Sequence, residues 1–182
     1  MVCSGHGEQG SEDCVVMKTF IVAAISVDGF IAADIAQSTD WTSKEDKKLF
    51  VELTRRAGVM IMGNNTFKTI GRALPDRKTI VYSRTIPEMI PENVEFTSED
   101  PSMLLKQLEI KGYNEVAICG GQSIYDIFLQ AGAVDELYIT VEPTIFGAGI
   151  SLFKTAALHD LTLKECTNLN TNAVLLHYEV QK

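Results

Sequence analysis

The chain has 182 residues, of which 46% are hydrophobic and 22% are charged, values typical of a globular protein. This length suits one domain, and the composition excludes disordered, collagen-like and coiled-coil classes. Sixteen basic and twenty-four acidic residues give a net charge of −8, which opposes non-specific attraction to nucleic acid or to an anionic membrane. An anionic ligand must therefore be held by a local arrangement of donors.

Residues 1–16 contain glycines, serines and acidic residues but neither a basic start nor an apolar stretch, so we expect a flexible tail and not a signal peptide. The longest apolar run, Phe20–Ile25, is far too short to span a bilayer. Four cysteines occur without a Cys-x-x-Cys spacing and three histidines are scattered, so we expect neither a zinc site nor a disulfide framework. The sequence therefore predicts a cytoplasmic protein with one domain over residues 17–182.

Hydrophobic periodicity and turn residues predict an alternation of strands and helices. Strands are predicted at Lys18–Ile25, Val59–Met62, Thr79–Tyr82, Val94–Thr97, Val116–Cys119, Leu137–Val141, Leu161–Thr167 and Val174–Val180. Helices are predicted from Ser43 to Gly58, over Asn64–Ile70, from Asp100 to Gly112, and around Ile124–Phe128 before Gly132. This order predicts an α/β fold with a mainly parallel sheet, to which the last two strands add an antiparallel hairpin.

Two predicted strands run directly into helix starts through glycine, at Gly63 and at Gly120-Gly121. A helix N-terminus presents free N–H groups and a partial positive charge, and both turns lie at the carboxyl ends of strands, where α/β proteins bind nucleotides. The glycines could instead serve only to make tight turns. No G-x-G-x-x-G or P-loop pattern is present, so neither an ordinary Rossmann protein nor a phosphate-transfer enzyme is supported.

Asp46 is the acidic residue of most interest. It lies three residues after Ser43, the spacing of a capping box, and could do no more than stabilise the start of that helix. It could also border an apolar cavity and bind a planar amidine-like edge, with its proton affinity raised by desolvation. Basic residues cluster at Arg72, Arg77, Lys78 and Arg84, which could bind a carboxylate or phosphate or form a solvated rim. Trp41 and Tyr125 could be packing aromatics.

Taken together, these segments resemble the dihydrofolate reductase family over nearly all of residues 18–182. The spacing of its W-x(4)-[DE]-x(3)-F-x(3)-T signature is found at Trp41, Asp46, Phe50 and Thr54. Its M-G-x-x-T-[WF]-x-x-I-G-R-x-L-P-x-R segment, its glycine pair and its L-Y-[LI]-T strand are similar to Met62–Arg77, Gly120-Gly121 and Leu137–Thr140. The resemblance implies a three-layer fold with helices on both faces of the sheet, and hydride transfer from NADPH to 7,8-dihydrofolate.

The resemblance also implies roles for individual residues. Asp46 would bind the amino and amide edge of the pterin, and Thr140 would bridge to it. The substrate would be lined by Ala24, Ile31, Phe50 and Leu74, and its glutamate carboxylate would be clamped by Arg77. NADPH would be bound by Gly63, Asn64, Thr66, Ser83, Arg84, Cys119, Gly120, Gly121, Gln122, Ser123, Ile124 and Tyr125. No metal, nucleic acid or membrane partner is implied, and the protein would be a monomer or a homodimer.

Two positions depart from the family pattern. Asn64 stands where a basic residue usually follows Met-Gly, which places the preference for NADPH on Arg84. The loop Asp34–Asp40 before Trp41 lacks the usual Gly-x-[LM]-Pro sequence and is two residues longer, so its closure over the nicotinamide is in question.

A second resemblance leaves the substrate open. Ser26–Ala32 and Gly132–Gly149 are similar to the pyrimidine reductases of riboflavin synthesis, which share the fold and the use of NADPH. Phe30 stands where that family usually has a lysine, and its D-D-P-x-L-T-[VA]-R stretch is absent. The helix that carries Asp46 and the Leu74-Pro75-x-Arg77 segment favour dihydrofolate. A non-catalytic nucleotide-binding module of this fold is the alternative from another functional class.

Overall fold

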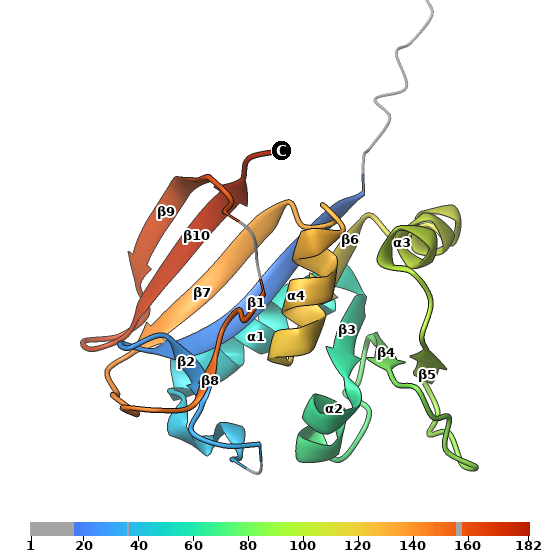
Figure 1. Cartoon of the computed structure of the whole chain (residues 1–182), viewed down its shortest axis with the longest axis horizontal. Helices are drawn as coiled ribbons and strands as arrows, with labels where there is room; N and C mark the ends of the chain where they lie inside the picture. The colour runs from blue at the N-terminus through green and yellow to red at the C-terminus, as the bar shows by residue number, and fades with distance from the viewer. Residues whose placement is uncertain (1–16, 36, 156–157) are drawn as a thin grey trace, which may run out of the picture.

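The computed structural model describes residues 17–35, 37–155 and 158–182; the predicted N-terminal tail, residues 1–16, lies outside them. Figure 1 shows its helices and strands, among which every predicted element occurs in the predicted order. The strands are β1 (Lys18–Ser26), β2 (Phe30–Ala32), β3 (Val59–Gly63), β4 (Lys78–Tyr82), β5 (Val94–Thr97), β6 (Glu115–Ile118), β7 (Glu136–Glu142), β8 (Ile150–Ser151), β9 (Leu161–Asn168) and β10 (Val174–Val180). The helices are α1 (Lys44–Ala57), α2 (Asn64–Ile70), α3 (Pro101–Ile110) and α4 (Gln122–Gln130), with a short 3₁₀ helix at Thr39–Trp41.

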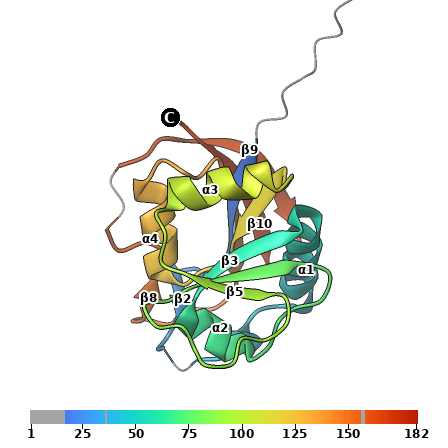
Figure 2. The same ribbon diagram turned by 90° about the vertical axis from the view of Figure 1, so that its right-hand side faces the viewer.

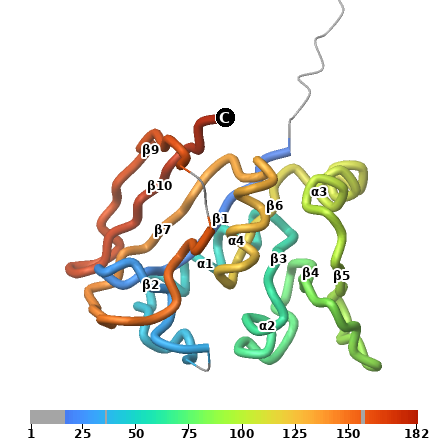
Figure 3. The backbone as a smooth tube through the Cα atoms, in the orientation of Figure 1, coloured from blue at the N-terminus to red at the C-terminus, as the bar shows by residue number. Residues whose placement is uncertain are grey.

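Within the described residues, one large sheet has the strand order β5-β4-β3-β6-β1-β7-β10-β9. The strands from β5 to β7 are parallel to their neighbours, whereas β10 is antiparallel to both β7 and β9. Figure 3 traces this path, with the β9–β10 hairpin at one end of the sheet and the β4–β5 connection at the other. The predicted α/β fold with a C-terminal hairpin is confirmed. The short pair β2–β8 was not predicted.

The sheet has an apolar layer on each face because side chains alternate along its strands. On β1, Ile21 and Ala23 pack with residues of α3 and α4, whereas Phe20 and Val22 pack on the side of α1. Figure 2 shows α3 and α4 on one side of the sheet and α1 on the other. This gives the predicted three layers.

The ends of α1 follow the local chemistry that its sequence predicts. The Ser43 hydroxyl accepts a hydrogen bond from the Asp46 N–H at 3.2 Å and caps the first turn. Gly58 ends the helix with a φ of 69°, a conformation that glycine adopts without steric cost. The helix therefore starts and stops where predicted, which fixes Asp46 in its first turn.

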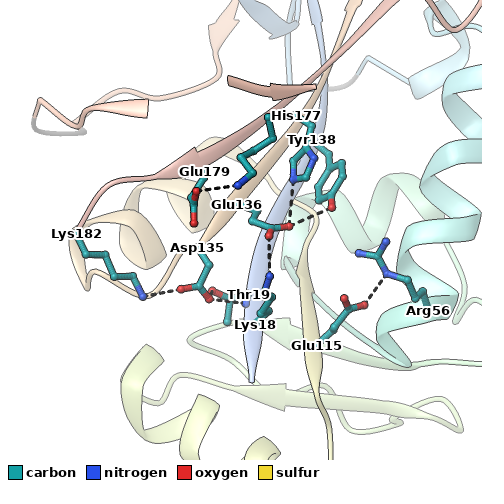
Figure 4. A network of polar contacts seen from close by, with 11 residues as sticks. Lys18, Thr19, Arg56, Glu115, Asp135, Glu136, Tyr138, His177, Glu179 and Lys182 are labelled. Atoms are coloured by element: carbon teal, nitrogen blue, oxygen red, sulfur yellow. Dashed lines mark hydrogen bonds and ion pairs between the residues drawn. The ribbon is translucent and has the colours of Figure 1, made fainter. Parts of the chain in front are cut away.

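A polar network covers the amino ends of β1 and β7 (Figure 4). The Glu136 carboxylate accepts hydrogen bonds from Lys18 Nζ and the Tyr138 hydroxyl, both at 3.1 Å, and lies 3.2 Å from His177 Nε2. The pKa of Lys18 is raised by its hydrogen bond and ion pair with Glu136. Charged groups at this edge of the sheet are thus paired within the chain, and the candidate site lies at the opposite edge. None of the described helices is long and apolar enough to cross a membrane.

Candidate active site

A cleft of about 1640 Å³ opens at the carboxyl ends of the parallel strands. Its walls come from the ends of β1, β3, β4 and β6, from the exposed side of α1, and from the first turns of α2 and α4. In a parallel sheet these strand ends lie together, so helix N-termini that are far apart in sequence open into one space. This is the edge at which the sequence predicted a nucleotide.

The cleft brings together all of the predicted site residues except Thr140 and Arg77. Those on its walls are Ala24, Ile31, Asp46, Phe50, Gly63, Asn64, Thr66, Leu74, Ser83, Arg84, Cys119, Gly120, Gly121, Gln122, Ser123, Ile124 and Tyr125. The predicted substrate residues come from the β1 end, α1 and the segment after α2, and the predicted cofactor residues from the glycine turns and the β4 end. One continuous cleft can therefore hold a planar substrate and a dinucleotide side by side.

Asp46 lies on the cleft wall and is only 8% exposed. Burial raises the pKa of its carboxyl above the usual range, and hydrogen bonding from Thr140 and Thr42 opposes this shift without cancelling it. Such a carboxyl can bind a planar cationic edge in two-point fashion while water is largely excluded. The first-turn position that helps the helix also aims Asp46 at the cleft, so its two interpretations are compatible.

Thr140 lies behind Asp46 and not on the wall. It is 1% exposed on β7 and pairs in register with Ala24 of β1. Its hydrogen bond to the Asp46 carboxyl links the central sheet to α1. The structure therefore places Thr140 in contact with Asp46, as the resemblance implied, while its role toward a substrate stays a prediction.

Arg77 is turned into the protein and is 6% exposed. Its Nε donates to the Pro75 carbonyl at 3.0 Å, and its Nη1 donates to the Thr54 hydroxyl and, at 3.5 Å, to the Val51 carbonyl. These bonds anchor the segment after α2 to α1. They leave the two N–H groups of Nη2 without a hydrogen bond to the described residues. The predicted carboxylate clamp thus falls to Nη2 and remains a prediction.

The two glycine turns pack directly against each other. The Gly63 N–H donates to the Gly120 carbonyl at 2.6 Å. Gly120 has a φ of +105°, and a Cβ added there would lie 2.9 Å from the Tyr125 hydroxyl, so only glycine fits. A Cβ at Gly121 would lie 3.3 Å from Thr66 Oγ1. This close approach brings the starts of α2 and α4 side by side at the floor of the cleft.

Tyr125 connects α4 to the central strand. Its hydroxyl donates to the Val22 carbonyl at 3.1 Å, and burial raises the pKa of this phenol well above its ordinary value. Its ring packs edge to face with Phe153 at 6.3 Å, while the residue also lines the cleft. Tyr125 therefore packs against its neighbours and also lines the cleft, while its role toward a cofactor stays a prediction.

Loops that are distant in sequence pack together beside the cleft. The Asp28 carboxylate accepts hydrogen bonds from the N–H groups of Phe146 and Gly147, the latter at 2.7 Å. The Trp41 ring packs edge to face on Phe146 at 5.0 Å and lines the cleft. The sequence analysis did not predict that the Asp28 carboxylate holds the segment after β7. Nothing local to Asp28 indicates a partner more than a hundred residues away.

The segment 18–157 matches the family model described as dihydrofolate reductase. The chain belongs to the dihydrofolate reductase family. It is 32% identical over 124 residues to dihydrofolate reductase type 3 of Salmonella typhimurium, covering 68% of this chain and 71% of that protein. It is also 28% identical over 174 residues to the uncharacterised protein YwjB of Bacillus subtilis, covering 88% and 97%.

Solved structures confirm the dihydrofolate reductase fold. The Enterococcus faecalis dihydrofolate reductase, complexed with NADP(H) and RAB-propyl, superposes with a TM-score of 0.71 and 21% identity, covering 91% of this chain and 97% of that one. A putative riboflavin biosynthesis protein from Shewanella sp. PV-4 superposes with a TM-score of 0.75 and 22% identity, covering 91% and 100%. The fold is thus shared with a dihydrofolate reductase and with a putative riboflavin biosynthesis protein, in line with the two resemblances in the sequence.

Dihydrofolate reductase family members bind NADPH, and the cleft residues of this chain fit that group. No side chain caps the start of α4 in the described structure, so its first N–H groups face the cleft and are available to a phosphate. Ser83 and Arg84 supply a hydroxyl and a cation at the end of β4. Beside them the Tyr82 hydroxyl is buried without a hydrogen-bond partner among the described residues. No group of three His, Cys, Asp or Glu side chains in the described ranges could hold a metal ion.

The two departures from the dihydrofolate reductase pattern both lie on the cleft. Asn64 is on the wall at the start of α2 and contributes no charge there, whereas Arg84 is a cation on the same wall. From the longer loop, Asp34, Ile35, Gln37 and Thr39 line the cleft, and its last residues form the 3₁₀ helix before α1. The described residues of the altered loop therefore form part of the cleft wall.

Proposed function

We propose that this protein reduces 7,8-dihydrofolate to tetrahydrofolate with NADPH. The observation that carries the proposal is the position of Asp46: a carboxyl 8% exposed, on the wall of a cleft that also contains the two glycine turns. Its burial and raised pKa suit a group that pairs with the amino and amide edge of a pterin. A solvent-exposed helix-capping aspartate would have neither property.

The chain's own residues orient the substrate and exclude water. Asp46 holds the pterin edge, Thr140 fixes the Asp46 carboxyl from behind, and the apolar side chains of Ile31, Phe50 and Leu74 sandwich the ring system. Bonding of the pterin edge to Asp46 raises the proton affinity of the neighbouring imine nitrogen, N5, which must gain a proton during the reaction. Holding the reacting atoms in this geometry lowers the entropic part of the barrier.

NADPH, when bound, supplies the hydride to carbon 6 of the substrate. The backbone N–H groups of Gly121 and Gln122 and the hydroxyl of Thr66 would hold its phosphates, and Ser83 with Arg84 would bind its 2′-phosphate. The Nη2 group of Arg77 binds the glutamate carboxylate of the substrate.

The second candidate function is reduction of a riboflavin-pathway pyrimidine. It is favoured by the bond of Asp28 to the segment after β7, since both ends of that contact lie in the stretches similar to the pyrimidine reductases. It is disfavoured by Phe30, which supplies no cation for a substrate phosphate. A non-catalytic nucleotide-binding module would retain the glycine turns and bind cofactor without turnover.

Consumption of NADPH by the purified protein distinguishes these functions. We expect oxidation of NADPH with dihydrofolate, a loss of about 100-fold or more in kcat/KM in Asp46→Asn, and no oxidation with the ribosylamino-pyrimidine of riboflavin synthesis. Oxidation with the pyrimidine alone would move the protein to the second function. Binding of NADPH without oxidation in either assay would favour the non-catalytic module.

A further inference from the structure

Glu142 is a buried carboxylate at the end of β7 that no cation neutralises in the described structure. It is 3% exposed, and its Oε1 accepts hydrogen bonds from the Ser43 N–H at 2.8 Å and the Ser43 hydroxyl at 2.6 Å. Removing a carboxylate from water without an ion-pair partner is costly, so hydrogen bonds must compensate for the lost hydration. Packing alone therefore does not explain why a carboxylate is buried at this position.

Ser43 links the Glu142 carboxylate to the backbone of Asp46 through two hydrogen bonds. The Ser43 hydroxyl donates to Glu142 and accepts from the Asp46 N–H at 3.2 Å. Because one hydroxyl has a single proton, donation to Glu142 turns its lone pairs toward the helix. The carboxylate thus fixes the orientation of the cap that begins α1.

Strand β7 holds the first turn of α1 at two points. Thr140 and Glu142 are two residues apart on β7 and face the same side of the sheet. Thr140 hydrogen-bonds to the Asp46 carboxyl, and Glu142 bonds to Ser43, the residue that caps the same turn. The side chain and the backbone of Asp46 are therefore both positioned from one strand.

We propose that Glu142 is a positioning residue of the candidate active site, which holds the first turn of α1 through Ser43 and places a second negative charge beside Asp46. The consequence for turnover rests on the proposed function, whereas the coupling between the two carboxyl groups does not. In dihydrofolate reduction, Glu142 would keep Asp46 aimed at the pterin edge without touching the substrate.

The sign of the electrostatic effect follows from the groups that face Asp46. The charge of Glu142 raises the pKa of Asp46, in the same direction as burial, because a neighbouring anion disfavours ionisation. Lys47 on α1 lowers it, as do the hydrogen bonds from Thr42 and Thr140. Across the cleft, Tyr125 stays neutral because burial and the Asp46 charge both raise its pKa.

The test compares Glu142→Gln with the matched variant Glu45→Gln. The glutamine keeps an oxygen for Ser43 and removes the charge, and Glu45 is an exposed glutamate next to Asp46 in sequence. The titration midpoint of Asp46 is measured by carbon-13 NMR of its carboxyl in the protein without cofactor or substrate, with Asp46→Asn for assignment. We expect Glu142→Gln to lower the midpoint by about half to one pH unit, the size expected for a nearby unit charge at a partly hydrated boundary.

We expect Glu45→Gln to lower the midpoint by less than about 0.3 unit, because solvent screens an exposed charge. Equal shifts in the two variants, or none in Glu142→Gln, would refute the coupling. The link through Ser43 is tested with Glu142→Ala, which removes the acceptor of the Ser43 hydroxyl and keeps Ser43 itself as the cap. Amide hydrogen exchange at Asp46 should become at least tenfold faster, and an unchanged rate would refute the positioning role.

These readouts need no turnover, so the two hypotheses can fail separately. A shifted Asp46 midpoint in a protein that does not oxidise NADPH with dihydrofolate would support the role of Glu142 and reject the proposed function. An active enzyme in which Glu142→Gln changes neither the Asp46 midpoint nor the pH profile of kcat/KM would reject the role of Glu142 alone.

Discussion

The buried guanidinium of Arg77 provides a quantitative test of how the substrate side of the cleft is held together. The variant Arg77→Met keeps an apolar stem of similar length and removes the donors to Pro75, Thr54 and Val51. A hydrogen bond from a charged donor contributes about 1.5–3 kcal/mol, and the contact to Val51 at 3.5 Å contributes little. Two effective bonds, partly compensated by the buried apolar stem, give an expected loss of about 2–4 kcal/mol.

Urea denaturation and thermal unfolding measure this loss directly. A change of about 2–4 kcal/mol lowers the melting temperature of a chain of this size by roughly 4–16 °C. The matched control is Arg72→Met, an exposed arginine in the same segment with no hydrogen bond to the described residues, for which we expect a change within about 0.5 kcal/mol. A loss below about 0.5 kcal/mol in Arg77→Met would refute the anchoring role. Its KM for dihydrofolate should rise while its affinity for NADPH stays within about twofold, because the proposed clamp on the glutamate carboxylate involves the substrate and not the cofactor.

Three further predictions concern stability and cofactor binding. Asp46→Asn should be more stable than the wild type at neutral pH, because the raised pKa of Asp46 means that folding opposes its ionisation. In urea titrations this difference in stability should disappear as the pH falls below the ordinary carboxyl range. A variant less stable than the wild type at neutral pH would contradict the prediction. Gly120→Ala should lower the free energy of unfolding by about 2–4 kcal/mol and abolish NADPH binding, because the φ of +105° and the contact with Tyr125 leave no room for a Cβ. The control Gly112→Ala, with open space around it, should lower the free energy of unfolding by only about 1 kcal/mol. Equal losses in the two variants would contradict the close packing at Gly120. Arg84→Ala should raise the KM for NADPH about tenfold and leave that for NADH unchanged, and a parallel rise in both would remove Arg84 from the 2′-phosphate.

The parts of the fold that depend on local chemistry could be predicted from the sequence. The cap at Ser43 and the stop at Gly58 act within a few residues, so α1 begins and ends as expected. The pair β2–β8 could not be predicted, because it joins Phe30 to Ser151 and each strand is too short to show a periodicity of its own.

The candidate site likewise has residues that could be predicted from the sequence and residues that could not. The glycine turns and Asp46 are visible in the sequence because their residue types and spacing are restrictive. The inward turn of Arg77 depends on Thr54, a partner on α1 that the local sequence does not specify. Glu142 was missed as well, although it lies two residues after Thr140 on a strand, so alternation alone places both on one face. The alternation of side chains is visible in the sequence, but it points to Glu142 only once the hydrogen-bond partners of this buried carboxylate are known.

The most direct test of the central claim is the affinity of a diaminopyrimidine antifolate for the NADPH-loaded protein, measured by calorimetry in the wild type and in Asp46→Asn. We expect tight binding to the wild type and a roughly 100- to 1,000-fold weaker binding to the variant, since removal of the charge-assisted pair costs about 3–4 kcal/mol. Weak binding to both proteins, or equal binding to both, would contradict the claim that Asp46 recognises the edge of a pterin.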